Sequence, residues 1–286
     1  MKTPAAIRCI AVAVTATLIL AALANAQEAA IQAIRIQEPG PLLDPEAAFW
    51  STAPAITVPM LAQTITTPKN PNAAIHALQV RAAHNGQWLG VQIEWQDSAK
   101  NDRIVVDQFG DQVAVEFPYE YKKDALPSPM MGNPGGRVEI WQWRAAFQRD
   151  IDEGEIRSIG DLYPNAVVDI YPDQVLRVTD ARPYTGALGV DNPISHGRRS
   201  AVLEQMAEGW GTLTAEPFDQ QTEGRGVWKD GVWRVVITHP LTSLRNDIHF
   251  QPGMETVAAF AVWDGGNREV GARKAWSMWV PFRLAE

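Results

Sequence analysis

The stretch from Leu78 to Trp95 reads LQVRAAHNGQWLGVQIEW, and it decides the fold class. Apolar and polar residues alternate on both sides of the Asn85-Gly86 pair. An Asn-Gly pair between two runs of period two is typical of a β-hairpin, because both turn residues must accept a positive φ. We therefore expect two antiparallel strands that are joined at residues 85–86.

The same kind of pattern recurs along the rest of the chain. Further alternating or strand-like runs, most of them next to Gly, Asp, Asn or Pro, occupy residues 113–117, 138–143, 226–237, 257–263 and 273–284. Many short strands with tight turns predict a mainly β protein, an antiparallel β-sandwich with a few short helices. One such helix is expected at residues 199–208, inside a segment, 145–210, that we interpret as an elaboration on the main sheet.

The N-terminus has the features of an export signal. Lys2 and Arg8 provide a basic start, residues 9–23 are apolar, and Ala24-Asn25-Ala26 fits a cleavage site. We predict a Sec-type signal peptide over residues 1–26, a single mature domain over 27–286, and a periplasmic location without a membrane span. The alternative is an uncleaved anchor, for which the apolar run is short. Removing Lys2 and Arg8 takes the net charge from −8 to −10.

Composition excludes several classes of function. The 286 residues include one cysteine, Cys9, which excludes disulfides, thiolate zinc sites, protein-bound iron–sulfur clusters and covalent haem attachment from the mature chain. An acidic chain without a basic run is a poor nucleic-acid binder. No GxSxG motif and no paired histidine spacing is present, so these patterns give hydrolase chemistry little support, although they leave a catalytic triad open.

Lys274 is the first residue that suggests a bound cofactor. Alternation places it on one face with Trp276, Met278 and Phe282, so we expect it to point into the core. A buried lysine without a partner becomes neutral, and a neutral amine is a metal ligand. The alternative is a lysine at the sheet rim whose ammonium reaches the solvent.

The second suggestive feature is Met130-Met131-Gly132, inside a loop rich in Pro and Gly at residues 127–136. A methionine thioether is a soft ligand that suits haem iron or copper. The alternative is a pair of methionines that fill a gap in the core. Together, a thioether in a constrained loop and an inward lysine predict a haem iron site, and some of the 11 tryptophans would line an apolar pocket around it.

The sequence resembles a known family in several ordered motifs, which are residues 131–134 (MGNP), 138–143 (VEIWQW), 224–236 (GRGVWKDGVWRVV), 261–265 (AVWDG) and 273–277 (RKAWS). These motifs resemble the haem-binding γ subunits of ethylbenzene dehydrogenase, dimethyl sulfide dehydrogenase, chlorate reductase and selenate reductase. The resemblance implies a β-sandwich related to the DOMON and family 9 carbohydrate-binding folds. It also implies one non-covalent haem b with Met131 and Lys274 as axial ligands, and Met130 as the reserve for the first.

The resemblance further implies a role in electron transfer rather than catalysis. The chain would relay electrons between the iron–sulfur β subunit of a complex, whose α subunit carries molybdenum, and a soluble periplasmic c-type cytochrome. One alternative is a secreted carbohydrate-binding module that uses surface tryptophans to stack on sugars. Another is a structural subunit that has kept the fold and lost the haem.

Overall fold

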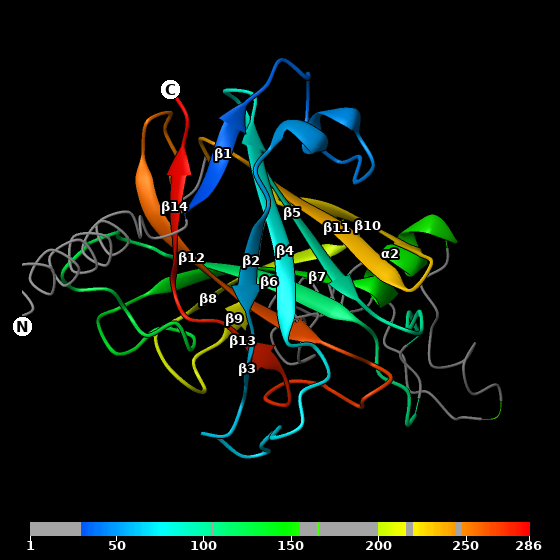
Figure 1. Cartoon of the computed structure of the whole chain (residues 1–286). Coiled ribbons are helices and arrows are strands. Elements are labelled where there is room, and N and C mark those ends of the chain that lie inside the picture. The colour runs from blue at the N-terminus through cyan, green and yellow to red at the C-terminus, as the bar shows by residue number, and fades with distance from the viewer. Residues whose placement is uncertain (1–29, 104–105, 155–164, 166–199, 216–219, 244–247) are drawn as a thin grey trace, which may run out of the picture.

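The computed structural model describes residues 30–103, 106–154, 165, 200–215, 220–243 and 248–286. The predicted signal peptide at residues 1–26 and the larger part of segment 145–210 lie outside these ranges. Strands make up most of the described chain, and Figure 1 shows them arranged around a central core. None of the helices in the described ranges is long and apolar enough to cross a membrane.

The strands form two layers, which are the two halves of one sheet that folds over itself. The first layer has the order β10 (Glu223–Lys229), β11 (Val232–Pro240), β5 (Trp88–Gln96), β4 (Ala77–His84), β1 (Ile31–Arg35) and β14 (Val280–Leu284). The second layer has the order β12 (Glu255–Trp263), β6 (Gln112–Pro118), β7 (Val138–Arg144), β8 (Val202–Ala207) and β9 (Thr214–Ala215). Three short strands complete them: β2 (Ile56–Pro59) pairs with β4, and β13 (Ala275–Trp276) pairs with β12 and with β3 (Leu61–Ala62).

Strand β12 joins the two layers. Its first residues, 255–258, pair with β14, and its remaining residues, 259–263, pair with β6. The predicted mainly β sandwich is therefore confirmed. The pairing is antiparallel except at β1, which runs parallel to both β14 and β4.

The two predicted hairpins are confirmed, and their turns show why. Asn85 Oδ1 accepts the backbone N–H groups of Gln87 and Trp88 at 3.0 and 2.7 Å, while Gly86 has a φ of 84°. The second hairpin, β10 and β11, turns at Asp230 and Gly231, whose φ values are 52° and 79°. The second turn has the two consecutive positive φ angles of a type I′ turn, whereas in the first turn only Gly86 has a positive φ.

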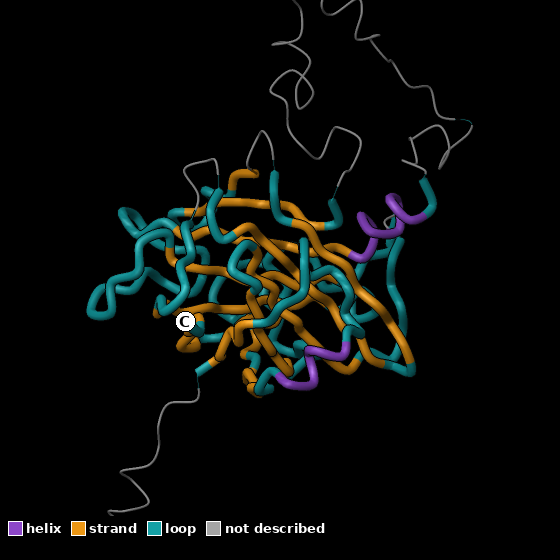
Figure 2. Tube along the Cα trace, turned by 90° about the horizontal axis from the view of Figure 1, so that it is seen from above, coloured by secondary structure: helices purple, strands orange, loops and turns teal. Residues whose placement is uncertain are grey.

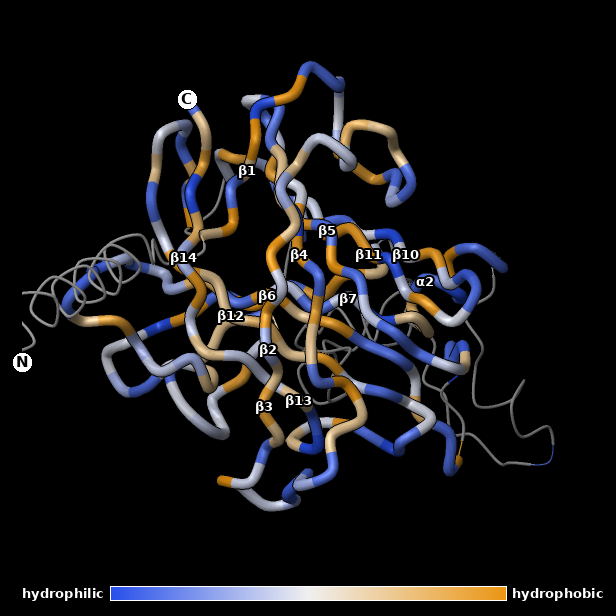
Figure 3. The backbone as a smooth tube through the Cα atoms, viewed as in Figure 1, coloured by the Kyte–Doolittle hydropathy of each residue, from blue (hydrophilic) through white to orange (hydrophobic). Residues whose placement is uncertain are grey.

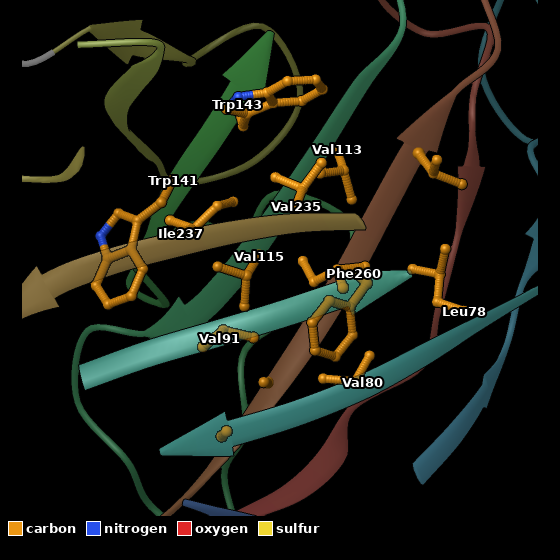
Figure 4. Packing of buried hydrophobic residues seen from close by; sticks show 14 of the residues in the cluster. Leu78, Val80, Val91, Val113, Val115, Trp141, Trp143, Val235, Ile237 and Phe260 are labelled. Atoms are coloured by element: carbon orange, nitrogen blue, oxygen red, sulfur yellow. The ribbon is translucent and has the colours of Figure 1, made fainter. Parts of the chain in front are cut away.

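The core lies between the inner faces of the two layers and is rich in aromatic residues (Figure 4). Trp141 of β7 stacks on His239 of β11 with ring centroids 4.6 Å apart, and Trp143 meets Trp233 edge-on at 5.0 Å. Figure 3 shows hydrophobic segments along the central strands, and Figure 2 shows the helical segments at the margin of the strands.

The helices differ from the prediction. The described helices are η1 (Ala48–Thr52) and α2 (Ala145–Asp152). The helix expected at residues 199–208 is wrong, because residues 202–207 form β8, between β7 and β9 of the second layer. This stretch has only a weak helical preference. Its pairing with β7 outweighs that preference, and so does the hydrogen bond that the Gln221 N–H donates to Glu204 Oε1 at 2.8 Å.

The strand that was predicted at residues 273–284 is in fact two strands, β13 and β14, with a break between them. At the break, the Ser277 N–H donates to the carbonyl of Phe260 and the Phe260 N–H donates to Ser277 Oγ, each at 2.9 Å. The alternation therefore changes phase, and Ala275 and Phe282 share the core while Met278 is exposed. The prediction that Lys274 points into this core is wrong, since it lies on the opposite face of the second layer.

Candidate functional site

A cavity of about 520 Å³ lies over the outer face of the second layer. Its floor includes three small residues, Ala114 of β6 with Ala259 and Ala261 of β12. Ala114 and Ala261 face each other across the strand pair, so neither side chain fills the space above them. The volume is within the range of cavities that bind cofactor-sized ligands.

Loops from both edges of this layer wall the cavity. The wall residues come from four loop segments and two tryptophans, namely residues 63 and 66, 129–131, 210–213, 270–274, Trp263 and Trp276. Most of the exposed cavity surface is apolar. The site is thus a mainly apolar chamber between the sheet and its edge loops.

Met131 enters the cavity from a tightly held loop. It has a φ of 67°, its carbonyl accepts the Gly209 N–H at 2.7 Å, and its own N–H donates to the Glu116 carboxylate. Gly132 follows with a φ of 72°, and a Cβ there would come within 2.4 Å of the Gly136 carbonyl oxygen. The loop therefore requires glycine at 132, and this fixes the position of the preceding methionine.

Both methionines line the cavity, but they are held differently. Met131 packs against the apolar cluster of the outer face, which includes Ala114, Ile140 and Trp263. The backbone N–H of Met130 donates only to Ser128 Oγ, at 3.2 Å. The contacts of Met131 with the floor favour it over Met130 as the residue directed into the chamber.

Lys274 lines the same cavity from the opposite edge. It precedes β13, on the side of β12 away from β6, whereas the Met131 loop contacts the end of β8. Its Nζ lies 5.2 Å from the centroid of a Trp263 ring. Burial lowers the pKa of Lys274, and the charge of Glu116 opposes that shift. Burial thus shifts Lys274 toward the neutral amine, although the face on which it lies was predicted wrongly.

Glu116 is the site residue that the sequence analysis missed. Its side chain is buried beneath the cavity, and burial raises its pKa to about 8 against the opposing effects of Lys274 and the Met131 N–H. Strand alternation contained a signal, since Glu116 lies between the core residues Val115 and Phe117 and must face the other way. Glu116 thus links the two segments that carry the candidate ligands.

A polar corner occupies part of the cavity lining. Gln142 Nε2 donates to Gln112 Oε1 at 2.7 Å, and Arg144 Nη2 donates to Gln142 Oε1 at 2.9 Å. All three side chains line the cavity, where Arg144 is the cationic residue besides Lys274. This corner offers a positioned guanidinium to an anionic group of a bound molecule.

The tryptophans do not form the exposed row of rings that a sugar-binding surface needs. All eleven lie in the described ranges; six are buried, four are half-buried and Trp210 is exposed. Trp210, Trp263 and Trp276 line the cavity, as the predicted apolar pocket requires, and most of the others lie in or against the two cores.

The chain is similar to several known proteins. Residues 47–175 match the family model described as ethylbenzene dehydrogenase. A haem subunit assigned to the respiratory nitrate reductase of Haloferax mediterranei is 26% identical over 83% of this chain and 67% of its own length. The chlorate reductase subunit gamma of Ideonella dechloratans is 28% identical over 86% of this chain and 81% of its own. A family 9 carbohydrate-binding module from Caldicellulosiruptor kristjanssonii, solved with glucose, covers 89% of this chain and 94% of its own at 12% identity and a TM-score of 0.42.

Proposed function

We propose that this chain, a member of the γ-subunit family of the ethylbenzene dehydrogenase type, is an electron-transfer subunit that holds one non-covalent haem b. The observation that carries the proposal is that Met131 and Lys274 line one apolar cavity from opposite edges of the sheet. A bound haem would supply one-electron chemistry at its iron, and the chain itself would perform no substrate chemistry.

The residues of the cavity fit such a group. A thioether and a lowered-pKa amine are two ligands that iron accepts, and a mature chain without cysteine fits a non-covalent attachment. The alanine floor leaves room for a flat macrocycle, and Trp263 and Trp276 exclude water from its surface. Arg144 in the polar corner is the group that would meet a propionate.

The protein's own contacts keep both ligand residues in place. Gly209 and Glu116 hold the backbone of Met131 through its carbonyl and its N–H group. The pairing of β13 with β12 fixes the segment that follows Lys274. Two protein ligands would fill both axial positions, so that the iron exchanges electrons without binding oxygen or substrate.

We further propose a periplasmic subunit of a larger complex. The signal peptide at residues 1–26 would be cleaved, and residues 27–286 would form one domain. The partners would be a molybdenum-containing α subunit, an iron–sulfur β subunit and a soluble c-type cytochrome. Supporting this, relatives are named as subunits of reductases, and a mature net charge of −10 suits a basic electron carrier.

The carbohydrate-binding alternative has less support. A sugar platform requires several tryptophans with exposed faces, and Trp210 is the exposed tryptophan of this chain, at 56%. It lies at the wall of the same cavity and offers no flat row of aromatic rings.

An optical spectrum of the purified mature protein tests the proposal. We expect sharp α and β bands after reduction with dithionite, and a pyridine haemochrome with haem that acid acetone extracts. A protein that stays colourless when haem is supplied during expression and again after purification would overturn the haem proposal.

The axial ligands are tested by substitution. Lys274→Ala and Met131→Ala should each lose the six-coordinate low-spin spectrum, while Met130→Ala keeps it. Lys229→Ala, at the exposed hairpin turn, is the matched control for removing a lysine. Loss of the spectrum in Met130→Ala with retention in Met131→Ala would overturn the assignment of Met131.

A further inference from the structure

Three acidic residues meet where strands of both layers end. Asp97 follows β5 of the first layer, Asp111 precedes β6 of the second, and Asp264 follows β12. One carboxylate oxygen from each lies within 4.8 Å of the others. Asp97 and Asp111 are buried, and none of the three forms an ion pair within the described part of the chain.

The surroundings hold Asp111 firmly in place. Its Oδ2 accepts the Asn101 N–H at 2.7 Å and Trp233 Nε1–H at 2.9 Å, and its Oδ1 accepts the Gly265 N–H at 2.9 Å. Burial, followed by the charge of Asp97, raises the pKa of Asp111 to about 7. A group of buried acids without a cation is therefore costly when they are ionised.

Two further oxygen atoms at this place have no hydrogen-bond partner among the described residues. Asp97 is only 5% exposed, and its Oδ2 is unpartnered, as is the buried Asn101 Oδ1. Asn101 Oδ1 and Asp264 Oδ1 each lie 3.1 Å from the position that a Cβ on Gly266 would occupy, so they belong to the same small space. Buried oxygen acceptors without donors are the arrangement that a cation satisfies.

We propose that Asp97, Asp111 and Asp264, with the side-chain oxygen of Asn101, bind one Ca²⁺ ion. The ligands are all hard oxygen atoms, and neither histidine nor cysteine is part of the group. Ca²⁺ accepts several protein oxygens in flexible geometry, whereas Mg²⁺ demands octahedral geometry and keeps several waters. A site made of buried carboxylates on three separate segments fits the larger ion.

The ion would tie the two layers together at one edge. It would connect the end of β5 with β6 and β12, which carry the floor of the cavity. Asp264 also begins the segment that ends at Lys274. Binding of Ca²⁺ would therefore stabilise the fold and fix the start of that segment.

Calcium binding by the mature protein after treatment with EDTA tests the proposal. Titration calorimetry should show one Ca²⁺ per chain, and the thermal midpoint should rise with Ca²⁺ concentration and much less with Mg²⁺. Tb³⁺ should show luminescence sensitised by Trp233, because its indole donates directly to Asp111. Trp233→Phe should reduce this luminescence while still binding Ca²⁺, and Trp228, which donates to the Asp97 carbonyl, should supply part of what remains.

Variants distinguish this site from general attraction of cations. Asp97→Asn and Asp264→Asn should each weaken Ca²⁺ binding at least tenfold. Asp107→Asn is the matched control, since its side chain is 80% exposed in the same loop region and its removal should leave binding unchanged. These measurements do not depend on haem, so a failure of the calcium proposal can be distinguished from a failure of the proposed electron transfer.

Two results would overturn the proposal. One is a folded, EDTA-treated protein that shows neither binding heat nor a change in thermal midpoint with Ca²⁺. The other is equal weakening by Asp107→Asn and Asp97→Asn, which would mean non-specific attraction.

Discussion

Strands β6 and β7 present two very different faces to the rest of the molecule. On the inner face, Val115, Phe117 and Trp141 are completely buried against the first layer. On the outer face of the same strands, Ala114 and Gln142 line a cavity of about 520 Å³. The inner face is filled by large apolar side chains, whereas the outer face combines an alanine with polar side chains and borders a cavity.

Within this single pair of strands, the residues of the inner face therefore determine stability, and those of the outer face determine binding. A close-packed interior loses stability with every buried group that is removed. The outer face contributes less packing, so that its alanines and polar groups are free to shape a site. Substitutions on the two faces should therefore have effects of different kinds.

Trp141→Ala should have the largest effect. It removes an indole that stacks on His239 and meets Phe117, and the expected loss is about 3–5 kcal/mol of unfolding free energy. Denaturant unfolding measures it. Gln142→Ala, the next residue on the outer face, should lose only about 1 kcal/mol with its hydrogen bonds. Equal losses in the two variants would contradict the division between the faces.

Adding volume should give the second largest effect and the clearest contrast. Ala258→Phe on the inner face of β12 should cost about 1–3 kcal/mol or more through overpacking. Ala261→Phe, three residues further along the strand, projects into the cavity and should leave stability nearly unchanged while abolishing haem uptake. Unfolding curves and haem titrations of both variants provide the check. Normal haem uptake by Ala261→Phe would place the haem elsewhere.

The pH dependence of stability gives a third test, because Glu116 is a buried acid on the outer face. Glu116 has a raised pKa of about 8, compared with about 4.5 in the unfolded chain, so the folded state keeps a proton that the unfolded state has lost. The Glu116 carboxyl should therefore make the haem-free protein less stable as the pH rises from about 4.5 to about 8. Glu116→Gln should flatten this fall.

Glu120→Gln is the control for the pH experiment, because the Glu120 side chain is 72% exposed. The Glu120→Gln variant should show the same dependence of stability on pH as the unmodified protein. A steep fall that persists in Glu116→Gln would assign the pH dependence to another buried acid, with Asp111 as the first candidate.

The parts that were predictable from sequence rest on local chemistry. The hairpins at Asn85-Gly86 and Asp230-Gly231 were predicted because their turns require particular residues. Met131 and Lys274 attracted attention because each has a side chain that is unusual in its own neighbourhood. The parts that were missed depend on partners distant in sequence: β8 is a strand because of β7, and Glu116 is a site residue because of two loops above it.

Lys274 shows the limit of alternation most clearly. Alternation assumes an unbroken strand, but the hydrogen bonds between Ser277 and Phe260 interrupt it and reverse the faces. The lysine is still desolvated, because the outer face carries a chamber of its own. Alternation in the sequence shows only which residues share a face, so it cannot predict that the outer face carries such a cavity.

The sequence by itself determined the class of fold, the turns and the types of ligand available, since these follow from the backbone preferences and side-chain chemistry of nearby residues. Only the tertiary structure decided which face holds the cavity and which residues meet there. That outcome depends on β12 passing from one layer to the other, and on edge loops that bring Met131 and Lys274 over Glu116 of β6.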